Sequence, residues 1–363
     1  MTTLKPKILD WYIFKKFIVT FFIALLLIIG IVIVFDISEK IDKFVANEAP
    51  LRAIIVDYYL NFIPFFINMY SAMFVFITVI FFTSRMAANS EIVAILSGGV
   101  SFHRMMVPYI VASALIALLS LGLNLYIIPR SNQERLLFER DYVKDKRTAV
   151  RNVHYQISPG EFDFVESFST WNNTAYRFTL ESIENNQIVS KLSAETAVWD
   201  SLTGAWKLNK YFIRDYTTGM TDQVRSGARK DTVIALTVDD FYRNAQTVQT
   251  LPYNELRQLI RTQNMRGDSN VMYAEIEKHN RWAMPFSCII LTIIGVSLSS
   301  RKKRGGLGWN LALGIALAFS YILFQRFAQM FVFTGVMPPG LAIWIPNFLF
   351  AIIAAFLYRM APK

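Results

Sequence analysis

The sequence has little of what most enzymes and disulfide-stabilised modules depend on. Among its 363 residues it has one cysteine, Cys288, so the chain can form no internal disulfide. Its three histidines, His103, His154 and His279, show no metal-ligand spacing with a cysteine or carboxylate cluster. It also lacks a G-x-x-x-x-G-K-[ST] loop, an H-E-x-x-H and a G-x-S-x-G motif. Catalysis, a bound metal and nucleotide binding through such a loop are therefore not expected of this chain.

Charged residues are also scarce in six long apolar segments. The first of them, residues 17–35, has 19 residues without a charge, close to the roughly 20 needed to cross ~30 Å of hydrocarbon. Pro64 lies near the start of the second segment and predicts a kink there. The predicted transmembrane helices are residues 17–35, 58–84, 105–129, 282–300, 307–333 and 340–358. This pattern predicts an α-helical membrane protein with six transmembrane helices.

A polar block of about 150 residues separates the third predicted helix from the fourth. Residues 130–278 hold 20 Lys/Arg and 20 Asp/Glu, so the remaining 17 basic and 7 acidic residues give the chain its net charge of +10. Within the block, alternating runs such as residues 176–180 are separated by turn signals, which is typical of antiparallel strands. We predict membrane helices in residues 1–130 and 281–363, and between them, in residues 131–280, a β-jellyroll or sandwich domain with flanking helical extensions at Ser131–Lys146 and Asn254–Met265. The aromatic residues expected in the core of this domain are Tyr176, Phe178, Trp199 and Trp206.

The short loops predict the orientation of the chain. The loops on one side are rich in Lys and Arg, including the run at residues 301–304, against two acids, Asp10 and Glu91. On the other side Lys40, Lys43 and Arg52 are mixed with five acids. The positive-inside rule therefore predicts that both termini are cytoplasmic and that the β domain lies outside.

The loop between the second and third predicted helices contains a short apolar segment. Asn89 or Ser90 can cap a helix there, Glu91 suits its first turn, and Gly98 can end it. An apolar helix outside the bilayer needs a cover, either the lipid interface or a groove on a partner protein. The scarcity of Lys and Arg in the segment favours the partner. Its apolar side chains are Ile92, Val93, Ile95 and Leu96.

Basic side chains near the predicted outer surface can bind phosphate through charge-assisted contacts. For any one of them, solvated interfacial charge is the simpler interpretation. Arg326 is the one charge well inside a predicted helix, about 10 Å from its outer end at ~1.5 Å per residue. It either serves a function in the membrane or extends to the surface along its long side chain. The other basic candidates are Lys40, Lys43, Arg130, Arg135 and Arg140.

Several motifs occur in an order that resembles one membrane-protein family. They are Leu9-Asp10-x-Tyr12-Ile13, Pro64, S-E-I-x-A-x-x-x-x-G-x-S from Ser90 to Ser101, Ile157-x-Pro159-Gly160-x-Phe162, Ala194-Glu195-x-Ala197-x-Trp199-Asp200, and Tyr273-x-Glu275 followed by Arg281-x-x-x-Pro285. With three helices on each side of the polar block, this set resembles the lipopolysaccharide-export permeases, the LptF/LptG family. The N-terminal motif is more similar to the LptG-like member.

The resemblance implies a permease half-subunit of an ATP-driven ABC exporter in the bacterial inner membrane. In that family two permeases pair, a cytoplasmic ABC ATPase dimer carries ATP and Mg²⁺, and lipopolysaccharide passes to periplasmic jellyroll bridge proteins and a single-helix, membrane-anchored jellyroll partner. No cofactor on this chain and no nucleic acid partner are implied. The resemblance also implies roles for individual residues. Glu91, Ile92, Ile95, Leu96 and Gly98 would couple to the ATPase, with Glu91 pairing with a basic residue, whereas Lys40, Lys43, Arg130, Arg135, Arg140 and Arg326 would face the substrate.

Two other functions fit part of the pattern. A non-transporting membrane scaffold or binding module could carry an outer β domain, but it would not need an apolar helix that receives force from an ATPase. A lipoprotein-releasing exporter subunit is similar in general organisation, but its outer domain follows the first of four helices. Here the polar block follows the third of six.

Overall fold

The computed structural model describes residues 8–143, 149–185, 187–216, 222–234, 236–238, 241, 245–265, 267, 270–300 and 306–361. The basic run at residues 301–304, used above to predict orientation, lies outside the described residues. The chain forms two compact units. A helical unit comprises Met1–Phe138, Gln249–Tyr253 and Glu275–Lys363, and a β unit comprises Glu139–Val248 and Asn254–Ala274.

Six helices in the described part of the chain are long and apolar enough to span a membrane, which confirms the six-helix prediction. Several of them, such as α1 (Ile8–Ala46) and α11 (Val271–Ser299), extend beyond the apolar segments because polar flanking residues continue the helical turns. In α1, for example, Asp36 and Lys40 form an ion pair one turn apart. The six spans are Ile8–Ala46, Ser71–Ala88, Phe102–Tyr142, Val271–Ser299, Leu311–Phe333 and Pro339–Met360.

The second predicted helix is divided, and its break lies at Tyr70 rather than at Pro64. It consists of α2 (Leu51–Ala53), the π-helical η1 (Ile54–Tyr59), α3 (Leu60–Met69) and α4 (Ser71–Ala88). Pro64 lies inside α3, and the widened turns of η1 precede it, with the Leu60 amide donating to the Ile55 carbonyl. Wider turns accommodate a missing amide hydrogen bond without ending a helix. At Tyr70 the backbone leaves the helical region, with φ −110° and ψ 11°.

The third predicted helix continues much further than its apolar core. It consists of α6 (Phe102–Gly122), the π-helical η2 (Leu123–Ile127) and α7 (Ile128–Tyr142). The polar helical extension predicted after residue 131 is therefore present up to Tyr142, and its predicted end at residues 144–146 lies outside the described residues. Two shorter helices, α9 (Ala245–Val248) and α10 (Tyr253–Met265), precede the last three long helices. The sequence predicts α10 but not α9. The three long helices are α11 (Val271–Ser299), α12 (Gly306–Phe333) and α13 (Pro339–Met360).

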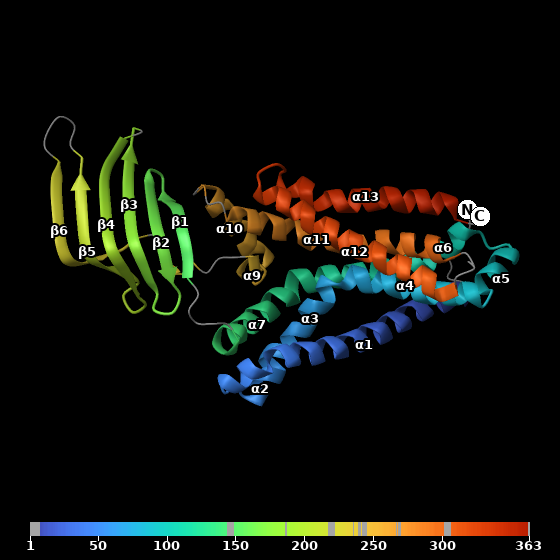
Figure 1. Ribbon diagram of the computed structural model, residues 1–363. Helices are drawn as coiled ribbons and strands as arrows, with labels where there is room; N and C mark the ends of the chain where they lie inside the picture. Colours follow the sequence, from blue (N-terminus) through green and yellow to red (C-terminus); the bar gives the residue numbers. More distant parts are fainter. Residues whose placement is uncertain are drawn as a thin grey trace. The chain divides into compact units, whose positions relative to one another are not determined.

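Helix α4 lies at the centre of the helical unit because it contributes to two apolar clusters (Figure 1). One cluster joins it to α1 and α6, where the rings of Phe82 and Tyr109 stack with centroids 5.2 Å apart. The other joins it to α11, α12 and α13. Gly314 permits the close approach of α12, since a Cβ atom there would meet the Ile80 side chain at 2.1 Å.

The β unit contains one antiparallel sheet whose six strands follow one another in sequence order. The predicted antiparallel β domain is therefore confirmed. Each described strand pairs with the next in sequence, β1 with β2 through a tight turn at Gly160 (φ +83°), so the described strands form a meander rather than exchanging between two sheets. The strands are β1 (Ala149–Ser158), β2 (Glu161–Ser169), β3 (Thr174–Glu184), β4 (Gln187–Asp200), β5 (Ala205–Asp215) and β6 (Gln223–Thr232).

One row of residues interrupts the alternation of buried and exposed side chains in the sheet. Arg177 in β3 and Lys210 in β5 have positive φ (49° and 48°) and pair with carboxylates of the preceding strand at 2.7 and 2.6 Å. In a regular strand, buried side chains are two positions apart. Here the buried Ala175 and Phe178 are three positions apart, because this row lies between them. The sequence predicts Tyr176 in the core, but this change of phase leaves it exposed, which corrects the prediction.

The core of the β unit is built around Trp206. Its ring is fully buried, and its Nε1 donates a hydrogen bond to the Leu236 carbonyl at 2.8 Å. Phe168 and Phe241 stack at 4.1 Å beside it. Burial of Trp206 and Phe178 agrees with the sequence prediction for both, and Trp199 packs on the edge of the same cluster.

Candidate functional site

The short apolar segment forms a helix, α5 (Glu91–Ser97), between α4 and α6. Ser90 enters it with φ 60°, and within the described chain its hydroxyl makes no capping hydrogen bond, so the predicted side-chain cap is not formed. The helix ends at Gly98, as predicted, but the left-handed residue is Gly99 (φ +83°). The Gly99 amide donates to the Leu96 carbonyl and the Val100 amide to that of Ile95. This paired arrangement satisfies the last carbonyls and stops the helix.

The Glu91 carboxylate is bound by α1 of the same chain. The Tyr12 hydroxyl donates to Oε2 at 2.9 Å, and Lys16 Nζ lies 3.1 Å from Oε2 and 3.3 Å from Oε1. Burial by itself would raise the pKa of Glu91, but the hydrogen bonds from Lys16 and Tyr12 and the positive charge of Lys16 outweigh it and hold that pKa below its usual value. Glu91 is therefore ionised at neutral pH.

A second ion pair lies on the other side of α5. Arg104, in the first turn of α6, contacts Asp10 of α1 at 2.5 Å, and its backbone amide donates to the Ser101 hydroxyl at 3.3 Å. The first turns of α1 are thus bonded to Glu91, which starts α5, and to Arg104, which follows it. The two pairs join residues 75 and 94 positions apart.

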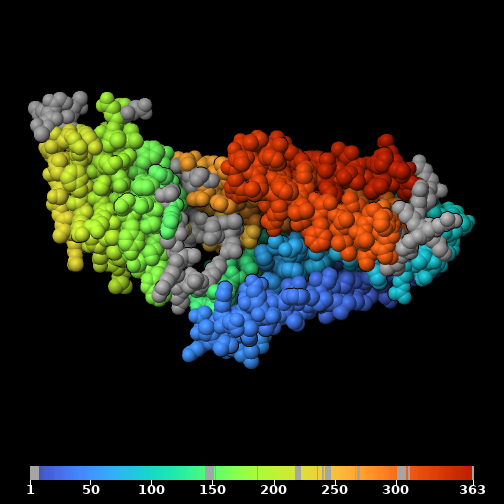
Figure 2. All heavy atoms as spheres, viewed as in Figure 1, coloured from blue at the N-terminus to red at the C-terminus, as the bar shows by residue number. Residues whose placement is uncertain are grey.

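The two faces of α5 have different environments. Ile92 is 1% exposed and packs in the cluster that contains Ile13 and Phe17, so the chain's own helices cover it. Val93 is 55% exposed. Figure 2 shows α5, in cyan, reaching the surface at one end of the helical unit. Of the predicted coupling residues, Ile92 is therefore part of the helical core, whereas Ile95 and Leu96 are half-buried and Gly98 is exposed. The outermost side chains of the helix are Val93, Ala94 and Ser97.

Lys40, a predicted substrate residue, is held by groups of its own chain. Its ammonium lies 2.6 Å from Asp36, also contacts the Tyr58 hydroxyl, and is 4.7 Å from the centroid of the Tyr58 ring. Asp36 accepts further hydrogen bonds from Tyr58 at 3.1 Å and Tyr59 at 3.0 Å. These contacts neutralise the charge of Lys40 within the protein. Lys43, one turn further along α1, is exposed.

The remaining basic candidates have different environments. Arg135 is buried, with its guanidinium 4.4 Å from the centroid of the Phe65 ring. Arg130 is exposed, and Arg140, which belongs to the β unit, forms an exposed pair with Asp141 at 3.0 Å. Their role as phosphate ligands stays a prediction.

Arg326 lies on an exposed face of α12. No ion pair within the described residues involves it. Its neighbours on that face are large apolar side chains, which suit lipid or another membrane helix. They are Phe319, Leu323, Phe327 and Met330. An arginine in this position can reach the membrane surface along its own stem or face a polar ligand, so both interpretations of the sequence stand.

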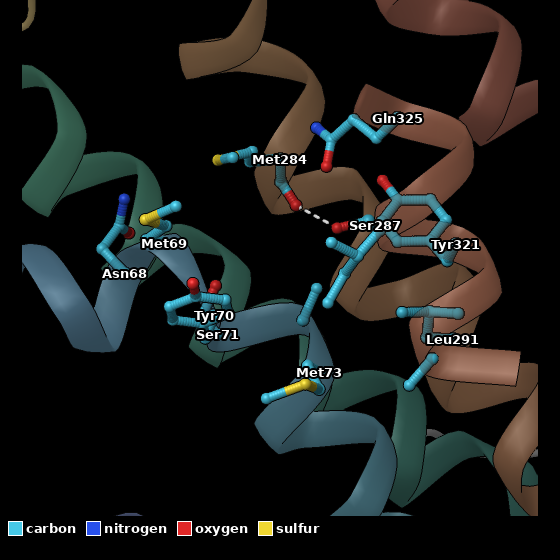
Figure 3. A pocket seen from close by; sticks show the side chains of 13 residues that line it. Asn68, Met69, Tyr70, Ser71, Met73, Met284, Ser287, Leu291, Tyr321 and Gln325 are labelled. Carbon is cyan, nitrogen blue, oxygen red and sulfur yellow. Dashed lines mark hydrogen bonds between the residues drawn. The ribbon is translucent and has the colours of Figure 1, made fainter. Parts of the chain in front are cut away.

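A small cavity lies at the break between α3 and α4 (Figure 3). Asn68, Tyr70 and Ser71 contribute from this side, and Ser287 of α11 and Gln325 of α12 from the other. Its volume is about 20 Å³, which is room for about one water molecule and far below what a lipid or nucleotide needs. Within the described residues, no group of three or more His, Cys, Asp or Glu is placed to hold a metal.

Sequence reasoning missed the partners of Glu91. The sequence shows Tyr12 as part of the N-terminal motif. It shows Lys16 and Arg104 only as two of the basic residues in the loops on the predicted cytoplasmic side. Tyr12 and Lys16 are one turn apart on α1, which predicts that they share a helix face. No local signal in the sequence indicates that this face meets residue 91, because the contact depends on how α1 packs against α4 and α6.

The comparison with known proteins places the whole arrangement in one family. The family described as "Lipopolysaccharide export system permease LptF/LptG" matches residues 11–360, which include all six spans, α5 and the β unit. No curated protein gives a significant individual match. A match over nearly the whole chain accounts for the inserted sheet as well as the helices, and its members are membrane subunits of a transporter rather than enzymes. This multi-pass membrane protein therefore belongs to the LptF/LptG family of lipopolysaccharide export permeases.

Proposed function

We propose that the chain is one half of the permease of an ABC exporter and that α5 is the helix on which its ATPase docks. The observation that carries the proposal is the environment of α5. One face packs in the helical core through Ile92, while Val93 lies on the exposed part of the helix and is open to a partner. A helix placed in this way can receive a push from another protein and pass it to the membrane helices.

The proposal places α5 and both termini in the cytoplasm of a bacterium, with the spans in the inner membrane and the β unit in the periplasm. The positive-inside rule supports this orientation. Contacts of α6 with α1 and α13 support the proposal that α5 and the two terminal helices meet at the same end of the helical unit. Arg104 pairs with Asp10, and His103 hydrogen-bonds Tyr358 of α13 at 2.9 Å. Figure 1 shows the start of α1 and the end of α13 at the end of the helical unit where α5 lies.

The proposed complex contains a second LptF/LptG-type permease, a cytoplasmic ABC ATPase dimer and the periplasmic jellyroll partners. ATP and Mg²⁺ belong to the ATPase, so no cofactor is proposed on this chain. Helix α1 supports the presence of a membrane partner, since apolar residues such as Leu26 and Phe35 are largely exposed along it. Lipid covers part of such a surface, and a second permease can cover the rest.

Lipopolysaccharide is the proposed substrate, extracted from the inner membrane and passed to the jellyroll bridge. Among the basic candidates, exposed Lys43, Arg130 and Arg326 remain available to its phosphate groups. Lys40 and Arg135 act in the proposal by positioning the helices, because each is bound within the chain.

Substitutions on the outer face of α5 test the proposal. The double variant Val93→Asp/Ser97→Arg places charge on an apolar contact surface without touching the core, so the complex should lose its ATPase on purification in detergent. The matched control is Arg359→Ala, an exposed residue on the last turn of α13. The control should retain the ATPase. Equal recovery of the ATPase with the double variant and the control would show that α5 is not the docking helix.

A further inference from the structure

Helix α3 is held in the helical unit in a different way from α4, the helix that follows it. Most side chains of α4 are buried, and they pack in both apolar clusters. Among the residues of α3, all of which the structure describes, only Asn68 is buried, with 4% exposed. Phe66 and Ile67 pack on the edge of one cluster. The position of α3 therefore depends largely on the hydrogen bonds of one asparagine.

Both ends of the Asn68 amide are bonded to the third span. Its Nδ2 donates to Asn124 Oδ1 at 2.8 Å, and its Oδ1 accepts a hydrogen bond from the Ser120 hydroxyl at 2.6 Å. Ser120 in α6 and Asn124 in η2 are 3% and 7% exposed, so water does not compete for these groups. In membrane helices such polar contacts fix the helices relative to each other. Asn68, Ser120 and Asn124 thus form a polar clamp between α3 and the third span.

The polar clamp lies next to points where both spans depart from a regular helix. Tyr70, two residues after Asn68, leaves the helical region, and its amide is shared between the carbonyls of Phe66 and Asn68. The cavity in Figure 3 lies between this break and helices α11 and α12. On the other span, Asn124 belongs to the π-helical η2. Breaks and π-helical turns are the places where long helices bend.

We propose that the residues of the polar clamp are positioning residues that make α3 move together with η2 and α7 about the break at Tyr70, while α4 stays fixed in the core. Helix α4 packs in two clusters, so it cannot shift without disturbing both. Helix α3 can shift if its partner on the third span shifts with it. This inference rests on the proposed function, in which the ATPase supplies the push at α5.

Distances between spin labels test the inference in the complete transporter in proteoliposomes. Because Cys288 is buried, labels can be attached selectively to cysteines introduced at the exposed Leu60 in α3, Tyr126 in η2 and Phe81 in α4. On addition of ATP and vanadate, the distance from 60 to 81 should change, whereas the distance from 60 to 126 should not. In Asn68→Leu the distance from 60 to 126 should change as well. The proposal is overturned by an unchanged distance from 60 to 81 in the wild type, or by a distance from 60 to 126 that responds alike in the wild type and in Asn68→Leu.

ATP hydrolysis stimulated by lipopolysaccharide gives a second measurement with matched controls. One hydrogen bond between membrane helices shifts an equilibrium about threefold, so Ser120→Ala should lower the stimulation about threefold and Asn68→Leu, which loses two bonds, about tenfold. Asn61→Leu in α3 and Ser113→Ala in α6 remove hydroxyl and amide groups that bond to carbonyls of the preceding turn. Both controls should stay close to the wild type. Losses as large in the controls would show that the polar clamp has no special role.

A neutral pair covers the case in which Asn68→Leu does not fold. Asn68→Leu/Asn124→Leu replaces both amides by apolar groups of similar shape, which leaves no buried amide without its partner and costs little stability. This variant should assemble and show the same loss of stimulation as Asn68→Leu. Full stimulation in the folded pair would show that apolar packing alone positions α3, which would overturn the inference.

Recovery of the ATPase on purification separates this inference from the proposed function. The variants of the polar clamp should all retain the ATPase, because they leave α5 unchanged. Loss of the ATPase from Asn68→Leu would show that the clamp acts in assembly rather than in movement, and would overturn the inference. Retention of the ATPase by Val93→Asp/Ser97→Arg would instead contradict the docking role of α5, and the label distances would still decide whether α3 moves with η2.

Discussion

The two ends of α1 carry the same three chemical groups but connect them differently. At the N-terminal end, Lys16 and Tyr12 lie on α1 and their carboxylate, Glu91, belongs to α5. At the C-terminal end, Lys40 and its carboxylate, Asp36, are both on α1, and the tyrosines come from η1. The first ion pair exists only while two elements keep their relative position. The second is maintained by α1 itself, whatever its neighbour does.

Burial adds to this difference. The side chains of Asp36 and Lys40 are 12% and 18% exposed, whereas those of Glu91 and Lys16 are 27% and 26% exposed. Electrostatic interactions strengthen as water is excluded, so the C-terminal group contributes more to stability. A more accessible pair that joins two elements is better suited to a contact that changes during a cycle. We therefore expect the C-terminal group to fix structure and the N-terminal group to transmit movement.

The largest effect on stability is expected from Asp36→Ala. The substitution removes the carboxylate that accepts hydrogen bonds from the Lys40 ammonium and from the hydroxyls of Tyr58 and Tyr59. Because the group is partly exposed, the free energy of unfolding should fall by about 2 to 3 kcal/mol, less than for a fully buried pair. The reactivity of the buried Cys288 thiol with a maleimide dye during heating measures the unfolding. The exposed acid Asp42 supplies the control, and a loss no larger in Asp36→Ala than in Asp42→Ala would contradict this interpretation of the C-terminal end.

A smaller loss of stability is expected when Lys40 is replaced, and almost none when Lys43 is replaced. Lys40→Met leaves Asp36 with two tyrosine donors, so it should lower the free energy of unfolding by about 1 to 2 kcal/mol. Lys43→Met should change it by less than about 0.5 kcal/mol, as is usual for exposed positions. In the transport assay, replacing Lys43 should have the larger effect of the two, because Lys43 is the more accessible to lipid phosphates. Stimulation by lipopolysaccharide that is unaffected in Lys43→Glu would remove Lys43 from the substrate surface.

The sequence predicts the architecture because its strongest signals are long and repetitive. Six long apolar segments and a polar block with alternating residues indicate the helices and the antiparallel domain without any knowledge of packing. Single positions are harder to predict. Pro64 predicts a kink, and in the structure it lies inside α3 after the π-helical turns of η1, whereas the break at Tyr70 has no such signal in the sequence. Tyr176 fits an alternating strand, but the positive φ of Arg177 changes the phase of β3.

At the candidate site, too, the sequence predicts local features but not how individual side chains pack. Residues 90–98 can be recognised from the sequence as an apolar helix with a glycine-rich end, because capping and composition are local properties. Their division into a covered face and an open face is not a local property. Ile92 and Val93 are adjacent and both apolar, and only the packing of the surrounding helices decides which of them is buried. The partners of Glu91 are set by the same packing.

The smallest effect should appear in the pH dependence of Glu91. Its folded-state pKa is held below the ordinary value of 4.5, so its contribution to stability is complete above that pH and is lost as the pH falls through the lowered value. For a partly exposed pair we expect wild type to exceed Glu91→Gln by about 0.5 to 1 kcal/mol in free energy of unfolding. This difference should be constant from neutral pH down to about pH 5 and should shrink at lower pH. Unfolding of both proteins, followed through the Cys288 thiol after quenching to one pH, measures it. A difference that already declines between pH 7 and pH 5 would mean that Glu91 is not held in its ionised form by Lys16 and Tyr12, and the contrast between the two ends of α1 would lose its electrostatic basis.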